Sequence, residues 1–226
     1  MSELIETYQE TLDWAKKAHG KQLRKYTFDS YISHPVAVAL LLEQAGESLA
    51  LEQAALLHDV LEDTAVDEQE LRKVFPKEVC DIVVGVTDVS VPEDGNRATR
   101  KALDHQHIAD GTREIHALKL ADCIDNIMSI MMHDHSFLKV YVKEIGALYE
   151  HIKGGNDYLA VILKTLLDAT KYQTTIMEIN KKVIRHNAHS RKASRVIRLD
   201  YLNKRLKEKL NRVEVNLRAV IRSSRT

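Results

Sequence analysis

Apolar residues recur at intervals of three and four positions along most of this chain, and no segment alternates apolar with polar residues as a half-buried strand would. This spacing places the apolar side chains on one face of an α-helix. Only eight Gly and three Pro interrupt the 226 residues, which favours long helices over a turn-rich β architecture. We therefore predict an all-α fold built as a helical bundle.

Residues that begin or end helices separate the predicted segments. The first helix is expected from about Glu3 to Ala18, with Gly20 ending it. Pro35 disfavours helical geometry at His34 and suits the first turn of a helix, so His34 is expected at a loop-to-helix junction. Further helices are predicted over residues 35–45, 49–63, 68–75, 77–88, 97–110, 113–132, 136–153 and 157–175.

The charges divide the chain into two parts. The whole chain is neutral, with 33 basic and 33 acidic residues. Residues 181–226 contain 15 Lys and Arg against three acidic residues, so they carry a net charge of +12 and residues 1–180 carry −12. Leu and Val recur every three or four positions over residues 199–220. We predict one domain over residues 1–175 and a long basic amphipathic helical extension over residues 176–226.

Two roles remain open for this extension. Its Leu and Val stripe would pack on the domain or on a second copy of the chain, which would make a homo-oligomer, and would leave Lys and Arg in solvent. The charge of +12 would also suit contact with a polyanion through phosphate neutralisation, with strong salt dependence. The sequence carries no base-reading motif.

The chain is expected to be cytoplasmic, with no contact with a membrane. The N-terminal residues MSELIETYQE are acidic where a signal peptide would be basic and then apolar, and the longest apolar run, residues 36–42, is too short to span a bilayer. Cys80 and Cys123 have neither a CxxC spacing nor the density of a disulfide scaffold, which indicates a reducing compartment.

Four ionisable residues stand together in the apolar segment AALLHDVLEDT: His58, Asp59, Glu62 and Asp63. On one continuous helix, His58 and Glu62 lie one turn apart, and Asp59 and Asp63 repeat that offset, so all four could face one pocket. Burying three carboxylates together is costly unless a cation balances them. Imidazole and carboxylate groups together bind Mn, Fe, Zn or Co type ions. A solvated helix face with a packed histidine is the alternative.

Two other segments offer matching ligands. His34 lies in YISHPVAVALL, and Asp122 interrupts the apolar segment ALKLADCIDNI. Either residue would extend a mixed shell of imidazole and carboxylate groups begun by His58 and Asp59.

The motifs AHGKQLRK, YISHP, ALLHDVLEDT, GVTD and LKLADCIDN follow one another in this order. They resemble the successive motifs of the RelA/SpoT hydrolase domain, a member of the HD superfamily. The match covers about residues 12–170 and is most similar to the small stand-alone alarmone hydrolases, including the animal SpoT homologue. The resemblance implies an HD-domain helical bundle that removes pyrophosphate from the 3′ position of (p)ppGpp, giving GDP or GTP, without a synthetase domain.

The resemblance also implies roles for individual residues. It places Glu62 and Asp63 at the hydrolytic water, where one would assist proton movement and the other would orient the water or its neighbour. It implies one manganese ion held by four residues: His34, His58, Asp59 and Asp122.

Substrate contacts follow from the same resemblance. Arg24 and Lys25 would bind the nucleotide, with the planar guanidinium of Arg24 stacking on the base. Arg100 and Lys101 would neutralise the pyrophosphate. Asn126, four residues after Asp122 on one helical face, would contact the sugar or a phosphate.

Two segments depart from the family pattern, so the substrate stays open. YTFDS follows Arg24 and Lys25 where the family has a small Gly-containing turn, and VSVPEDGNRAT follows GVTD. One alternative is an HD phosphohydrolase acting on a ppApp-type alarmone, a nucleoside monophosphate or NADPH. Another is a nucleotide-sensing binding module whose tail contacts a polyanion, although intact Glu62 and Asp63 favour an enzyme.

Overall fold

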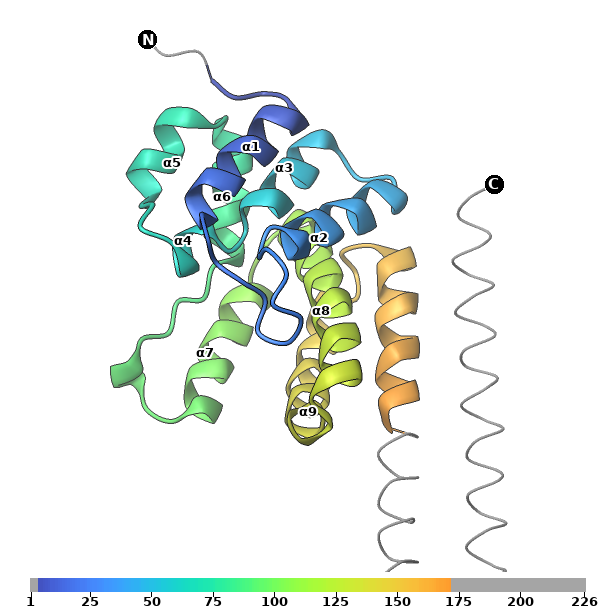
Figure 1. Cartoon of the computed structure of the whole chain (residues 1–226). Helices are drawn as coiled ribbons and strands as arrows, with labels where there is room; N and C mark the ends of the chain where they lie inside the picture. Colours follow the sequence, from blue (N-terminus) through green and yellow to red (C-terminus); the bar gives the residue numbers. More distant parts are fainter. Residues whose placement is uncertain (1–3, 172–226) are drawn as a thin grey trace, which may run out of the picture.

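The computed structural model describes residues 4–171, and within them the protein is helical without a β-strand. The helices are shown in Figure 1, and the prediction of an all-α bundle is confirmed. In chain order they are α1 (Tyr8–His19), α2 (Ser33–Gln44), α3 (Leu49–Leu57), α4 (Val60–Asp63), α5 (Glu68–Val74), α6 (Lys77–Val86), the 3-10 turn η1 (Pro92–Asp94), α7 (Arg97–Ala109), α8 (Arg113–His133) and α9 (His135–Ile152), followed by helical residues 157–171.

The predicted start of the first helix at Glu3 is wrong, because the chain before Tyr8 takes another course. The Thr7 side chain accepts a hydrogen bond from the Glu10 amide at 3.3 Å and so caps α1. The Ile5 amide instead donates to the Val74 carbonyl at 2.8 Å. The N-terminal residues are therefore tied to the end of α5 rather than continued as helix.

The predicted helix over residues 49–63 is divided in two. α3 ends at Leu57 and α4 begins at Val60, with His58 and Asp59 in a turn between them. Asp59 has φ −95° and ψ −1°, away from ordinary helical values. The interruption changes the direction of the side chains that follow it.

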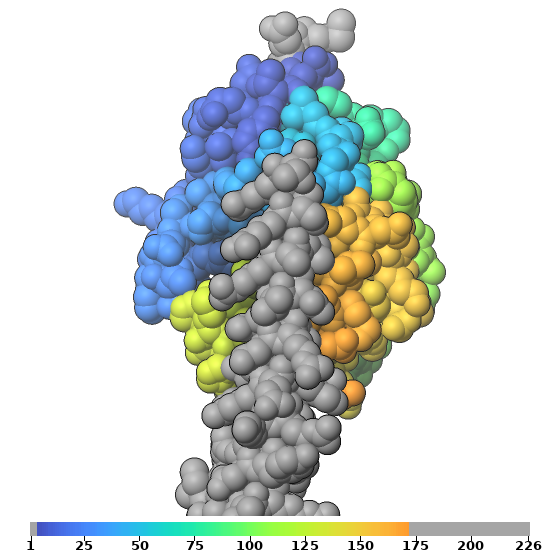
Figure 2. Space-filling model, turned by 90° about the vertical axis from the view of Figure 1, so that its right-hand side faces the viewer, coloured from blue at the N-terminus to red at the C-terminus, as the bar shows by residue number. Residues whose placement is uncertain are grey.

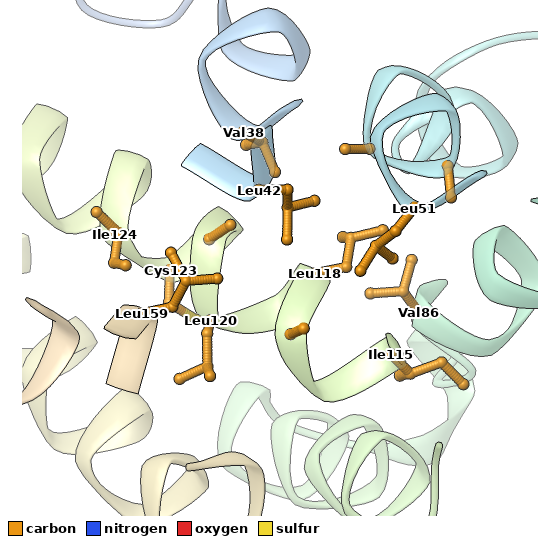
Figure 3. Packing of buried hydrophobic residues seen from close by; sticks show 14 of the residues in the cluster. Val38, Leu42, Leu51, Val86, Ile115, Leu118, Leu120, Cys123, Ile124 and Leu159 are labelled. Atoms are coloured by element: carbon orange, nitrogen blue, oxygen red, sulfur yellow. The ribbon is translucent and has the colours of Figure 1, made fainter. Parts of the chain in front are cut away.

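Helix α8 lies at the centre of the core. Its residues Leu118, Leu120 and Ile124 are almost completely buried. Figure 3 shows side chains of α2, α3, α6 and residues 157–171 pointing toward it, among them Val38, Leu42, Leu51, Val86 and Leu159. Burying one such side chain contributes about 1.5–3 kcal/mol. Any polar group on the inner part of α8 is therefore held in rigid, apolar surroundings.

A polar clamp joins the turn between α2 and α3, the start of α8 and the segment that follows α9. Arg113 donates to both carboxylate oxygens of Glu47 at 2.9 and 2.7 Å and to the Gly155 carbonyl at 2.9 Å. The Asn156 amide also donates to Glu47 at 2.7 Å. Residues from the N-terminal half and residues 157–171 accordingly reach the surface on one face of the molecule, as Figure 2 shows.

Within residues 4–171 no helix combines the length and the apolar character needed to cross a bilayer. Cys80 and Cys123 are both buried and free, which agrees with the absence of a disulfide expected from their spacing. The predicted basic helical extension lies outside the described residues.

Gly155 provides a test of this packing. A Cβ atom there would lie 2.5 Å from the Ala117 backbone nitrogen and 2.6 Å from the His116 carbonyl carbon, and neither can yield. We expect Gly155→Ala to lower the free energy of unfolding by about 1–3 kcal/mol. Gly146→Ala is the control, since open space surrounds that helical position; it should raise stability by about 0.5–1 kcal/mol. Thermal unfolding of both variants measures the difference, and equal effects would contradict the close packing.

Candidate metal centre and nucleotide pocket

Three separate elements bring the predicted metal ligands together. His34 lies in the first turn of α2, His58 and Asp59 lie between α3 and α4, and Asp122 lies in the middle of α8. The His34 Nε2 atom is 3.5 Å from Asp59 Oδ2 and 3.3 Å from Asp122 Oδ1. The ligand atoms of His34, His58 and Asp59 all lie within 4.8 Å of one another. The structure thus places the four residues in one cluster.

His58 points its free nitrogen into this cluster. Its Nδ1 donates to the Ala55 carbonyl at 2.8 Å, so Nε2 faces Asp59 Oδ2 at 3.1 Å and Asp122 Oδ1 at 3.8 Å. Nε2 is buried and makes no hydrogen bond. A buried polar atom without a partner costs about 1–3 kcal/mol. A metal–nitrogen bond would remove this cost, so the cluster suits a divalent cation by its donors and by this unpartnered atom.

Protonation balances the carboxylates when no metal is bound. Burial alone lowers the pKa of His34, but the hydrogen bonds that its ring donates to Asp122 and Asp125 outweigh burial and raise the pKa to about 10. Burial also opposes the charge on Asp122, yet the Lys119 ammonium, 2.9 Å away, and His34 hold the pKa of that carboxyl well below its usual range. A protonated His34 supplies the positive charge that a metal ion would bring, and metal binding would release that proton.

A pocket of about 420 Å³ opens beside the cluster. Asp59 and Asp122 line it, together with the aromatic side chains of Tyr26, Phe137 and Tyr141. Its charged lining residues are Arg24, Lys25, Asp59, Glu62, Asp88, Arg97, Lys101, Asp104, Lys119, Asp122 and Glu144. The pocket therefore combines apolar contact surface with many charged groups beside the candidate metal site.

The two predicted catalytic carboxylates do not share one position. Glu62 lines the pocket and accepts a hydrogen bond from the Asp88 amide at 2.9 Å. Asp63 does not line it and accepts from the Gln22 amide at 2.9 Å, while Gln22 contacts His19 at 2.8 Å. The expectation that both turn toward one pocket is wrong for Asp63, because the break after Leu57 removes the continuous helix on which it relied.

Glu62 is an exposed residue, but the protein around its carboxylate partly desolvates that group. This burial, with the charges of Asp88 and Asp59, raises the pKa of Glu62 to about 7. The Asp88 amide hydrogen bond opposes the increase. A carboxyl that titrates near neutral pH is suited to accept and release a proton there.

Three of the predicted substrate residues line the pocket, and each also contacts another side chain. Arg24 and Lys25 both line the pocket, but the Arg24 guanidinium donates to Asp125 at 2.7 Å, and the Lys25 ammonium lies 5.0 Å from the Tyr26 ring centre. Asn126 also lines the pocket and donates to the Asp122 carboxylate.

The second basic pair is split between two pockets. Lys101 lines the main pocket and forms ion pairs with Asp88 and Asp104. Arg100 lines an adjoining pocket of about 380 Å³, to which Lys101 also contributes. The Arg100 Nε atom is buried without a hydrogen bond.

Three residues at the site did not emerge from the sequence. The Tyr31 hydroxyl donates to Asp59, Lys119 pairs with Asp122, and Asp125 accepts from both His34 and Arg24. The spacing of Lys119 three residues before Asp122 could have indicated its pairing on a helix. Nothing local predicts the partners of Tyr31 or Asp125.

Residues 11–155 match the family described as HD domain. This chain belongs to the HD-domain family. A probable guanosine-3′,5′-bis(diphosphate) 3′-pyrophosphohydrolase of Mycoplasma pneumoniae is 30% identical over 197 residues, which cover 80% of this chain and 27% of that protein. MESH1 of Danio rerio, named guanosine-3′,5′-bis(diphosphate) 3′-pyrophosphohydrolase, is 38% identical over 125 residues, 54% of this chain and 67% of MESH1.

Structural comparison gives a related result. A solved structure described as a metazoan ortholog of SpoT that hydrolyses ppGpp has a TM-score of 0.66 and 25% identity, covering 74% of this chain and 97% of that one. The resemblance to RelA/SpoT-type hydrolases is confirmed. The chain spans only 27% and 20% of the Mycoplasma pneumoniae and Aquifex aeolicus relatives.

Metal binding should be visible in the stability of the protein. A ligand that binds only the folded state at 100 times its Kd stabilises it by about 2.7 kcal/mol. We expect Mn²⁺ to raise the Tm of the metal-free protein, and Asp122→Ala to lose most of that increase. Asp81→Asn, in an exposed ion pair with Arg72 on the far helices α5 and α6, should keep it. A Tm that Mn²⁺ leaves unchanged in the wild type would contradict the proposed site.

The titration of Glu62 predicts a pH dependence without metal. Its folded-state pKa of about 7 exceeds the ordinary value of 4.5, so its contribution to stability is lost as the pH rises through 7. Glu62→Gln keeps an acceptor for the Asp88 amide and stays neutral. With a chelator present to remove metal, the Tm of Glu62→Gln minus the Tm of the wild type should therefore increase from pH 5 to pH 8. Glu150→Gln is the control, because Lys153 lowers the pKa of Glu150; its Tm difference should stay constant over this range.

Proposed function

We propose that this protein hydrolyses the 3′-pyrophosphate of (p)ppGpp to GDP or GTP and pyrophosphate. The observation that carries the proposal is the buried cluster of two imidazoles and two carboxylates, which adjoins a pocket lined by Glu62 and by several cations. The relatives named as 3′-pyrophosphohydrolases of guanosine bis(diphosphate) supply the substrate class. Four residues would hold one manganese ion: His34, His58, Asp59 and Asp122.

A bound divalent cation would make water more acidic and offset charge on the phosphoryl group. Glu62 is the group placed to take a proton from the attacking water, since it lines the pocket and its pKa is raised to about 7. The water oxygen would form a bond to the 3′-linked phosphorus while the bond from that phosphorus to the ribose 3′ oxygen breaks, and the proton taken up by Glu62 would pass to the ribose 3′ oxygen to give the 3′ hydroxyl. Pyrophosphate leaves, and the nucleotide retains its 5′ phosphates.

Asp63 would act at a distance from the reacting atoms. Its carboxylate holds Gln22 at 2.9 Å, and Gln22 contacts His19, whose ring lies 4.8 Å from the ring of Tyr31. Tyr31 in turn donates to Asp59. Asp63 would therefore support the placement of Asp59 rather than orient the water directly.

The substrate would be held by cations that exchange partners. Arg24, Lys25 and Lys101 line the pocket, and Arg24 and Lys101 already contact carboxylates. A phosphate or base must displace these carboxylates to be bound. Arg100 would take part through the adjoining pocket, and Asn126 would contact the sugar or a phosphate.

We also propose a cytoplasmic location, supported by the two free, buried cysteines. The basic extension over residues 176–226 keeps its two proposed roles, packing in a homo-oligomer and contact with a polyanion.

The decisive assay is incubation of manganese-loaded protein with ppGpp, ppApp, NADPH and nucleoside monophosphates, followed by chromatography. We expect ppGpp to yield GDP and pyrophosphate, and Asp59→Ala to lose this turnover by at least a hundredfold. Asp81→Asn, remote from the pocket, should retain the wild-type rate.

Each other result would change the assignment. Turnover of a monophosphate or NADPH alone would move the protein to another HD phosphohydrolase activity. Binding of ppGpp without turnover would leave a nucleotide-sensing module. Equal turnover of ppGpp and ppApp would exclude a base-selective site.

A further inference from the structure

Asp125 occupies a position between the candidate metal centre and the nucleotide pocket. One of its oxygens, Oδ2, accepts from His34 Nδ1 at 2.7 Å and from Arg24 Nη2 at 2.7 Å. Its side chain is only 18% exposed, and that of Arg24 is 17% exposed. A single carboxylate oxygen thus joins a candidate metal ligand, His34, to a candidate substrate residue, Arg24. Arg24 and Asp125 are 101 positions apart in the chain.

The bond to His34 selects the form of the imidazole. Because a carboxylate only accepts, Nδ1 carries the hydrogen, and Nε2 is directed toward Asp59 and Asp122 at 3.5 and 3.3 Å. A carboxylate behind a histidine ligand holds the ring in its binding orientation and makes the opposite nitrogen a stronger donor. Losing such a partner reduces metal affinity by about 10–100-fold.

The bond to Arg24 anchors the loop before α2. The Arg24 amide donates to the Asp29 carbonyl at 2.9 Å, and Leu23 and Ser30 form an antiparallel bridge. Within residues 4–171 the polar partner of the Arg24 side chain is Asp125, so that carboxylate sets where the guanidinium lies along the pocket wall. Movement of this loop would leave the oxygen of Asp125 to His34 alone.

The periodicity of α8 explains how one helix contributes side chains both to the candidate metal centre and to the nucleotide pocket. Asp122, Asp125 and Asn126 are three and four residues apart, so they share one face of α8. Asp122 reaches the imidazoles, Asn126 lines the pocket, and Asp125 lies between α2 and the loop that carries Arg24.

We propose that Asp125 is a positioning residue that directs His34 Nε2 to the metal and, through the same oxygen, holds Arg24 at the nucleotide pocket. The inference rests on the proposed metal site and adds a shared anchor for metal and nucleotide binding. Its alternative is an ion pair that only stabilises the fold.

Calorimetric titration with Mn²⁺, without substrate, separates these two roles. Asp125→Ala should bind Mn²⁺ about 10–100-fold more weakly than the wild type. Asp125→Asn keeps an acceptor oxygen but loses the charge, so its affinity should fall between the two. Asp81→Asn, in which an exposed carboxylate is lost from α6, should bind as the wild type does.

Arg24→Ala tests the second half of the anchor. It leaves the contact between His34 and Asp125 in place, so Mn²⁺ affinity should stay within about threefold of the wild type while the KM for ppGpp rises. Asp125→Ala should raise that KM and weaken Mn²⁺ binding together. With Mn²⁺ saturating, Arg24→Ala and Asp125→Ala combined should raise the KM no more than the larger of the two single changes, because Asp125 acts on the nucleotide only through Arg24.

The outcomes distinguish the inference from the proposed function. If the wild type binds no Mn²⁺, the metal site itself is wrong. The positioning role is wrong if the wild type, Asp125→Asn and Asp125→Ala all bind Mn²⁺ with the same affinity. Both variants must first be shown to be folded, by circular dichroism spectra like that of the wild type. Should Asp125→Ala not fold, an Asp125→Asn protein with wild-type affinity overturns the proposal by itself.

Discussion

The charge of Asp122 is the constraint on which the site depends. This carboxylate lies in the middle of α8, where the helix packs against α2 and α3 and its apolar neighbours are almost completely buried. Burial opposes its ionisation, and Lys119 and the imidazoles offset that cost. Lys119 lies on α8 itself, but His34 comes from α2 and His58 from the end of α3, so the share of the compensation that the imidazoles supply exists only when these helices are packed. Core and site are therefore assembled by the same contacts.

Much of this site could be predicted from short stretches of sequence. His34 before Pro35, the pair His58 and Asp59 in an apolar segment, and Asp122 in an apolar helix each conflict with their surroundings unless they meet a cation. The structure brings all four together. The break between α3 and α4 could not be predicted in this way, because AALLHDVLEDT contains neither Gly nor Pro. His58 itself keeps φ −58° and ψ −32°, so no local signal marks the change.

Other features follow only from contacts between distant segments. The contact of Arg24 with Asp125 depends on how the loop before α2 lies over α8, whereas the family resemblance implied only that the guanidinium stacks on the base. Phe28, in the same loop, has φ 60° and is 74% exposed, so its bulk does not fill the pocket. Tyr26 does line it. Periodicity predicts which face of a helix is buried, but a loop without periodicity gives no such information.

The charges around the pocket favour an order of binding. Six carboxylates and five Lys or Arg side chains line it, and Arg97, Lys101 and Lys119 are each paired with an acid. Without a divalent cation, an anionic nucleotide gains less from entering, because four of the five cationic side chains must first leave a carboxylate: Arg24, Arg97, Lys101 and Lys119. With the protonated His34 these groups balance when no metal is bound, and a divalent cation that displaced the His34 proton would leave a net positive charge. A nucleotide with two diphosphate groups would gain more from that change than a monophosphate, so a bound metal would contribute to the proposed substrate selection as well as to chemistry.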